Sequence, residues 1–262
     1  MKTLLLFLFV FLNLEVDTSQ SSPEIKGPII VAMIDTGFDF KSSWEEHLSK
    51  VDTDGYRIRQ PKACKQGHKD FTGDGLEDKN GHGTHVAGII AKFAEDADYC
   101  LVILKYVAGK QENNMKTSIA AIQRAIDLKV HIINYSGGGV VKNEIECVLI
   151  KQAIDMGIAV VAAAGNEGKD VNVRPFYPAM CDNRVIAVRN TDDIGNIAGQ
   201  SNFTNKKKNS RELVEEKGVN VLSTLPNNEI GVMTGTSQSV PTYVGKLINK
   251  IKNKKSIKAW YN

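Results

Sequence analysis

The chain has 262 residues and a formal net charge of +3 at pH 7, and 42% of its residues are hydrophobic and 24% are charged. These proportions are typical of one compact globular α/β domain, and they exclude a disordered or fibrous chain. The charge is too small to indicate a nucleic acid partner.

The first residues have the pattern of an export signal. Lys2 supplies a positive end, and the apolar run from Leu4 to Leu12 is too short to span a bilayer. We expect residues 1–19 to be a signal peptide, with cleavage near Thr18 to Ser22. The mature protein is therefore expected to be secreted or extracytoplasmic and free of the membrane, with an uncleaved, tethered start as the alternative.

The apolar, partly β-branched run from Ile29 to Ile34 predicts a strand that is buried on both faces of a parallel sheet. Asp35 follows directly, and the carboxyl ends of parallel strands are where α/β folds place their sites. Asp35 is therefore a candidate site residue. Taken alone, the sequence Asp35-Thr36-Gly37 also fits a turn or a helix cap.

The segment from Phe38 to Lys79 is polar and irregular, which predicts surface loops with a short helix near Trp44 to Lys50. Its aspartates Asp70, Asp74 and Asp78 offer oxygen ligands that calcium accepts, although their spacing does not match an EF-hand loop. We interpret the segment first as a solvated acidic loop and keep calcium as the alternative.

Glycines lead from Asn80 into a stretch of small and apolar residues that reaches Ala91, which predicts a buried helix. His82 lies where the loop meets the helix, and His85 follows one turn later. The pair does not match the zinc protease helix, because Gly83 stands where that pattern needs a glutamate. We favour His82 as a base and His85 as a packed, hydrogen-bonded residue, with no metal at either.

Strands and helices then alternate. Strands are expected at Leu101–Leu104 and Val130–Asn134, with a helix at Met115–Leu128 between them. This rhythm predicts a mostly parallel central sheet with helices on both faces. The stretch from Tyr135 to Gly139 that follows lacks bulky side chains, so it either lets another backbone approach closely or forms a flexible loop.

A further helix is expected from Asn143 to Met156, followed by a buried strand at Ile158–Ala164. Asn166 falls just past the carboxyl end of that strand. Its side-chain amide is able to donate to a developing oxyanion, and its simpler role is that of a left-handed turn residue. Two more strands are expected at Val185–Val188 and Val219–Leu225.

The last helix is expected from Ser237 to Lys250, with Pro241 tolerated in its first turn. The turn Gly235-Thr236 presents the hydroxyl of Ser237 at the start of this helix. A serine hydroxyl is a poor nucleophile at neutral pH, so it requires a base and a third group that orients the base. Ser237 is the candidate nucleophile.

Four cysteines in an exported chain predict two disulfides. Three pairings are possible, and we prefer Cys64 with Cys100 and Cys147 with Cys181 because this pairing closes the shorter loops. A cysteine nucleophile is not favoured, since none of the four lies in a motif with a base.

Taken together, the segments from about Ile29 to Ile251 resemble the subtilisin-like serine proteases, the subtilases. The resemblance rests on four motifs: Asp35-Thr36-Gly37, His82-Gly83-Thr84-His85-Val86-Ala87-Gly88, Ala163-Ala164-Gly165-Asn166-Glu167-Gly168, and Gly235-Thr236-Ser237 followed by Pro241. Any one of them is a weak signal, but the chain order Asp, His, Asn, Ser is specific.

The resemblance implies a three-layer subtilisin-like fold and a serine endopeptidase that acts through an acyl-enzyme. Ser237 would attack the scissile carbonyl, His82 would accept its proton, and Asp35 would orient His82. Asn166 and the backbone N–H of Ser237 would form the oxyanion hole. No cofactor would be required, and calcium would be optional.

The resemblance also implies how a protein or peptide substrate is held by a monomeric enzyme. Ser136, Gly137 and Gly138 would pair with an extended substrate backbone, and Gly109 would lie on its opposite side. The pocket for the residue before the cut would be lined by Ala163, Ala164 and Gly165.

The chain also departs from the family pattern. No pro-domain is recognisable between the signal and the catalytic domain, so residues 20–262 are expected to be a minimal peptidase domain. Gln238, Ser239 and Thr242 replace the usual methionine, alanine and histidine. One alternative is a catalytically silent protein of the same fold that binds peptides or has a regulatory role. Another is an esterase, which requires a Gly-x-Ser-x-Gly elbow that Ser237 lacks.

Overall fold

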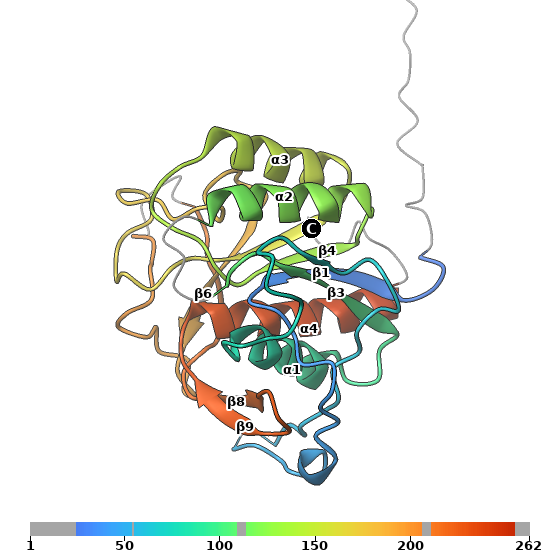
Figure 1. Ribbon diagram of the computed structural model, residues 1–262. Coiled ribbons are helices and arrows are strands. Elements are labelled where there is room, and N and C mark those ends of the chain that lie inside the picture. Colours follow the sequence, from blue (N-terminus) through green and yellow to red (C-terminus); the bar gives the residue numbers. More distant parts are fainter. Residues whose placement is uncertain (1–24, 54, 109–113, 206–210, 255–262) are drawn as a thin grey trace, which may run out of the picture.

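A parallel sheet of seven strands forms the centre of the protein (Figure 1). The computed structural model describes residues 25–53, 55–108, 114–205 and 211–254. In the described chain the strand order is β2-β3-β1-β4-β5-β6-β7, and all neighbours run parallel. The strands are β1 (Ile29–Asp35), β2 (Lys69–Asp70), β3 (Tyr99–Lys105), β4 (Ile132–Tyr135), β5 (Ala159–Ala163), β6 (Ile186–Thr191) and β7 (Val214–Lys217).

The central strands are apolar on both faces because helices cover both faces. In β1, Val31 and Met33 belong to one core cluster, while Ala32 and Ile34 belong to the other. Successive side chains of a strand point to opposite faces, so a strand buried on both sides needs a continuous apolar run. The three-layer α/β fold predicted from the sequence is confirmed.

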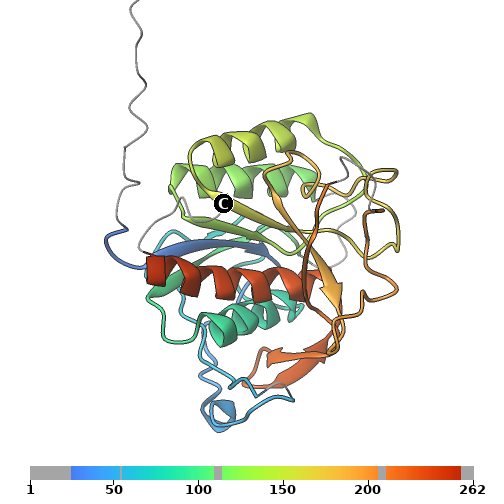
Figure 2. The ribbon, with the colours of Figure 1, turned by 180° about the vertical axis from the view of Figure 1, so that it is seen from behind.

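Two helices lie on each face of the sheet (Figures 1 and 2). The helices α2 (Met115–Asp127) and α3 (Glu144–Asp155) cover one face, and α1 (His82–Ala94) and α4 (Thr236–Lys254) pack together on the other. Nearly every side chain of α1 is buried, as the small and apolar stretch around Ala91 predicts. Pro241 is inside α4, whose first residue is Thr236, and so lies past the first turn in which it was expected. Its missing N–H therefore leaves the backbone oxygen of Ser237 without its usual helical donor.

The predicted elements are confirmed with shifts of a few residues at their ends, but three short strands are additional. They are β2, β7 and β9 (Ile230–Met233), and β9 pairs antiparallel with β8 (Val221–Thr224) in a separate hairpin. The expected helix near Trp44 is a single 3-10 turn, Glu45–His47. The extra strands at the edges are short or polar, so no periodic apolar pattern identifies them.

Both preferred disulfides are present. Cys64 is bonded to Cys100 on β3, and Cys147 on α3 is bonded to Cys181 in the loop before β6. Each bridge joins a loop to a regular element. The expected signal peptide, residues 1–19, lies outside the described residues.

Candidate active site

The four residues predicted to carry chemistry lie at the ends of regular elements. Asp35 is the last residue of β1, and His82 is the first residue of α1. Asn166 follows β5, and Ser237 is in the first turn of α4. β1 pairs with β3 on one side and β4 on the other, so its carboxyl end is a point where the strand order reverses. Open α/β sheets place their ligand crevices at such points.

Asp35 and His82 are in direct contact. Nδ1 of His82 lies 2.7 Å from Oδ1 of Asp35, and the carboxylate is 3% exposed. An ionised carboxylate only accepts hydrogen bonds, so Nδ1–H of His82 donates. The backbone N–H of Thr36 donates to the same oxygen at 2.8 Å. This arrangement fixes the imidazole in the tautomer whose Nε2 is able to accept a proton.

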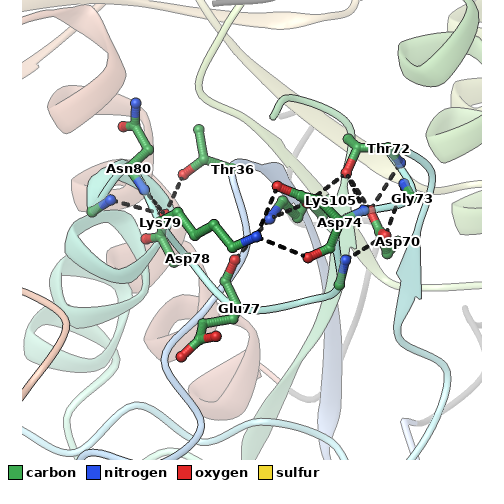
Figure 3. A network of polar contacts seen from close by, with 12 residues as sticks. Thr36, Asp70, Thr72, Gly73, Asp74, Glu77, Asp78, Lys79, Asn80 and Lys105 are labelled. Atoms are coloured by element: carbon green, nitrogen blue, oxygen red, sulfur yellow. Dashed lines mark hydrogen bonds and ion pairs between the residues drawn. The ribbon is translucent and has the colours of Figure 1, made fainter. Parts of the chain in front are cut away.

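Asp78 joins the loop of Asp35 to the loop of His82 (Figure 3). Its Oδ1 accepts from Oγ1 of Thr36 at 2.9 Å, and its Oδ2 accepts from N and Oγ1 of Thr84, both at 2.7 Å. Thr36 Oγ1 in turn accepts from the N–H of Gly83 at 2.9 Å. The carboxylate of Asp78, 3% exposed, thus caps α1 and holds both halves of the Asp35–His82 pair.

Gly83 has no room for a side chain. A Cβ at this position would overlap the backbone oxygen of Gly37. The loop after β1 and the first turn of α1 therefore approach each other at backbone distance, and only glycine permits this.

The pKa of His82 is raised above its ordinary value of 6.5. Burial lowers this pKa, but the charge of Asp35, the hydrogen bond to Asp35 and the charge of Asp78 together outweigh burial. A base must be neutral to accept a proton, so kcat/KM is expected to fall as the pH is lowered through this raised pKa.

Replacing Asp78 by asparagine should move that acid limb to lower pH, because it removes one of the charges that favour the protonated imidazole. The measurement is kcat/KM against pH for the natural chain and the variant. Glu77→Gln is the matched control, since Glu77 is an exposed acid in the same loop and is not among the groups that shift the pKa of His82. An unchanged midpoint in Asp78→Asn would contradict the assigned role of Asp78.

The three aspartates considered as calcium ligands bind the chain's own donors. Oδ2 of Asp70 accepts from the N–H groups of Gly73 and Gly75, both at 2.9 Å. Asp74 pairs with the buried Lys105 at 2.7 Å, which lowers the pKa of Asp74 to about 2. The described residues contain no cluster of three or more His, Cys, Asp or Glu side chains suited to a metal ion. We therefore do not place calcium at these aspartates.

Ser237 and Asn166 both lie next to Gly235. The Oγ of Ser237 and the Nδ2 of Asn166 are each 3.4 Å from the place that a Cβ would take at Gly235. Oδ1 of Asn166 accepts from the N–H of Thr236 at 2.9 Å, which leaves Nδ2 as the donor of this amide. Oγ of Ser237 donates to Oε1 of Gln238 at 3.0 Å, and no hydrogen bond joins the described side chains of Ser237 and His82.

The glycine stretch after β4 is closely approached by the chain itself. A Cβ at Gly137 would overlap the hydroxyl of Tyr106, and one at Gly138 would overlap the backbone oxygen of Tyr177. Gly139 pairs with Tyr177 in both directions, at 2.9 and 2.7 Å. Among the described residues, no backbone–backbone hydrogen bond is made by Ser136, Gly137 or Gly138. This edge is therefore open to another strand, whereas Gly109 lies outside the described residues.

The predicted pocket for the residue before the cut begins at the end of β5. Ala163 and Ala164 are buried, and Gly165 has a φ of +98°, which favours glycine. A Cβ at Gly165 would lie 2.5 Å from Oε2 of Glu167. Asn202 donates to that same oxygen at 2.6 Å. Glu167 is thus held against Gly165 by a residue that no sequence motif singled out.

His85 is a core residue, as expected. It is fully buried, and its Nε2 lies 3.1 Å from the backbone oxygen of Gly231. Burial, only partly opposed by that hydrogen bond, lowers its pKa to about 4. In the unfolded chain the same imidazole binds a proton below its ordinary pKa of 6.5. His85 therefore contributes stability that is full above pH 6.5 and is lost as the pH falls toward 4.

We expect the free energy of unfolding to fall more steeply between pH 7 and 4.5 in the natural chain than in His85→Gln. The fall in the natural chain should exceed the fall in His85→Gln by up to about 3 kcal/mol, because a pKa change of one unit corresponds to about 1.36 kcal/mol. Urea unfolding at several pH values measures it, with His47→Gln in the short 3-10 turn as the control. Equal slopes in His85→Gln and the natural chain would show that His85 is not the group responsible.

Comparison with known proteins yields one family. A model of the subtilase family matches residues 26–260. The "Major intracellular serine protease" of Bacillus subtilis is 38% identical over 69% of this chain and 60% of its own length. "Subtilisin DY" of Bacillus licheniformis is 33% identical over 64% of this chain and 62% of its own length. The chain thus spans about three fifths of these relatives.

A solved structure shows the same fold. The "Crystal Structure of a Lanthipeptide Protease" superposes with a TM-score of 0.68 and covers 88% of this chain and 77% of that chain. Its sequence identity is 20%, so the likeness concerns the fold alone. The family model and the structural likeness agree on a subtilisin-like α/β architecture.

Proposed function

The chain belongs to the subtilase family, and on this premise we propose that it is a serine endopeptidase that hydrolyses peptide bonds through an acyl-enzyme. One observation carries the proposal: the buried carboxylate of Asp35 lies 2.7 Å from Nδ1 of His82 at the crevice of the sheet. The family pattern supplies the nucleophile, Ser237, at the first turn of α4. A base that is oriented by a carboxylate is what activates a serine hydroxyl.

The proposed reaction begins with Ser237. Its Oγ leaves Gln238, gives its proton to Nε2 of His82 and attacks the scissile carbonyl carbon. The C–N bond then breaks, and His82 returns the proton to the leaving amine. Asp35 stabilises the imidazolium that forms between these steps. Water, activated by His82 in the same way, hydrolyses the ester on Ser237.

Asn166 is proposed to stabilise the oxyanion. Its Oδ1 is held by the N–H of Thr236, so Nδ2 is oriented before the substrate arrives. The backbone N–H of Ser237, at the N-terminus of α4, is the proposed second donor. Donors that are already in place cost no reorganisation when charge develops in the transition state.

Substrate binding is proposed to use the open edge after β4. An extended peptide would pair with Ser136, Gly137 and Gly138, whose backbone groups lack partners among the described residues. Gly109 is proposed for the opposite side. The side chain before the cut would enter the pocket of Ala163, Ala164 and Gly165, where the charge of Glu167 is close.

Export of the protein as a monomer is part of the proposal. The two disulfides support an oxidising compartment, because such bonds persist outside the cytoplasm. Two relatives, from Bacillus subtilis and Paenibacillus polymyxa, carry the word intracellular in their names. Within the described ranges, every helix is too short or too polar to cross a bilayer.

Labelling with a fluorophosphonate tests the proposal directly. The folded chain should take up one label at neutral pH, and peptide mass spectrometry should place it on Ser237. Chain unfolded in urea is the control and should take none, since activation depends on the folded site. Folded protein that takes no label and cuts no unfolded protein substrate would favour a silent peptide-binding subtilase. The hydrogen bond from Ser237 to Gln238 is the observation that favours this second function.

A further inference from the structure

A cavity of about 530 Å³ adjoins the proposed substrate edge. It lies between the first turn of α2, the end of β4 and the first turn of α3, and Gly138 and Gly139 form part of its wall. β4 pairs with β5, so the edge after β4 neighbours the pocket proposed for the residue before the cut. A peptide lying along Ser136–Gly138 would therefore bring a side chain from further upstream to this cavity.

The cavity contains a buried carboxylate that the proposed mechanism does not use. Glu146, on the first turn of α3, is 2% exposed. Oγ of Ser118 donates to its Oε1 at 2.6 Å, and the hydroxyl of Tyr135 donates to Oγ of Ser118 at 2.9 Å. Burial raises the pKa of Glu146, and the hydrogen bond from Ser118 opposes this only in part.

Glu146 forms no ion pair within the described part of the chain. The cavity wall includes one lysine, Lys142, and this lysine pairs with Glu144 at 2.8 Å instead. Burying a carboxylate without a cation costs desolvation free energy, and a cation that binds beside the carboxylate offsets part of this free energy. The site is therefore suited to a positively charged ligand.

Two further features of the cavity fit the same ligand. The Oδ1 of Asn114, another wall residue, is buried and accepts no hydrogen bond from the described residues. Val140 and Val141 also line the cavity and are 61% and 71% exposed. Lysine and arginine combine an apolar stem with a head that only donates hydrogen bonds. The stem would cover the valines, and the head would meet the two acceptors.

We propose that this cavity binds a lysine or arginine side chain of the substrate, upstream of the cut, and that Glu146 determines this preference. The inference rests on the proposed peptidase function. An apolar side chain would leave Glu146 and Asn114 without donors, and an acidic one would meet the charge of Glu146.

Fluorogenic peptides test the preference. The set carries lysine, arginine, norleucine or glutamate at each of the positions two to five residues before the cut. At one position the natural chain should cleave the basic peptides about 10- to 100-fold faster in kcat/KM than the norleucine peptide, the range expected for a charged hydrogen bond. Glu146→Gln should cut this ratio to about one while it keeps cleaving the norleucine peptide.

Asp155→Asn is the matched control, because Asp155 is an exposed acid at the other end of α3 and pairs with Lys151 and Arg184, which do not line the cavity. It should keep the preference. Thermal unfolding shows whether each variant folds. The proposal is overturned if no position prefers a basic residue, or if Glu146→Gln retains the preference.

Failure of the peptidase function has a different signature. In that case no peptide is cleaved and Ser237 takes no fluorophosphonate label. Fluorescence anisotropy of the same peptides then measures binding alone. Tighter binding of the lysine peptide to the natural chain than to Glu146→Gln would support the cavity assignment, and equal binding would refute it.

Discussion

Replacing Ser237 by alanine is expected to lower kcat about 10⁶-fold, a loss known from subtilisin itself. Alanine removes the atom proposed to attack the scissile carbonyl, and the other two hydroxyl residues of the first turn of α4, Thr236 and Ser239, are fully buried. Substrate binding should persist, because the open edge after β4 and the pocket at β5 do not involve the hydroxyl. The measurement is kcat with an unfolded protein or peptide substrate, together with fluorophosphonate labelling, which should disappear.

Ser239→Ala is the matched control for Ser237→Ala. Ser239 lies two positions later on α4, is fully buried, and donates to the backbone oxygen of Glu216 at 2.9 Å, away from the proposed reaction. It should retain label and turnover. A Ser237→Ala variant with more than about one hundredth of the natural activity would show that another group attacks the substrate.

Replacing Asp35 by asparagine is expected to lower kcat about 10⁴-fold. In the natural chain the carboxylate of Asp35 accepts a hydrogen bond from Nδ1–H of His82 at 2.7 Å. An asparagine amide in the same place is able to donate a hydrogen bond to Nδ1 instead. The proton of the imidazole then moves to Nε2, so His82 loses the lone pair that accepts the proton of Ser237. The change is nearly isosteric, and KM should change little.

Single-turnover kinetics with an activated ester would separate this effect from slow product release. Thermal unfolding should show that Asp35→Asn is folded, and Glu77→Gln serves again as the acidic control in the neighbouring loop. A loss smaller than about 100-fold would mean that Asp35 does not set the tautomer of His82.

The sequence was sufficient to predict the parallel sheet and to place the motifs at one edge of it. Apolar runs such as Ile29–Ile34 and Ile158–Ala164 predict buried parallel strands because a strand covered on both faces has no polar side. Once these strands run parallel, the residues that follow them, Asp35 and Asn166, must lie at one edge of the sheet. The contact of Asp35 with His82 follows from this edge and from the helix start at His82.

Short strands and buried ion pairs were not predictable in this way. The strand β7 (Val214–Lys217) is polar and pairs only at the edge of the sheet, so it carries no apolar period. Lys105 extends an apolar run, yet its ammonium group is buried against Asp74 and the backbone oxygen of Glu77. Its partners come from a loop that lies far from it in the sequence.

Asp78 shows the same limit for a residue close to the proposed chemistry. The sequence presents it as one of three acids in a polar loop, interpreted first as a solvated acidic loop and alternatively as calcium ligands. An aspartate shortly before a helix start is also a capping signal, which could have identified half of its role. The other half, its bond to Thr36, exists only because β1 and α1 meet.

The sequence by itself determined the layered α/β fold and the four positions proposed for catalysis, because apolar periodicity and short motifs are local properties. For the disulfides it gave only a preference among three pairings, and the structure contains the preferred one. Tertiary structure alone decided which groups surround those positions. Asp78 reaches Thr36 and Thr84, Gln238 holds the hydroxyl of Ser237, and Glu146 meets Ser118. The contacts of Asp78 with Thr36 and of Glu146 with Ser118 join positions far apart in the chain. The energies of all these contacts depend on burial, which no local pattern encodes.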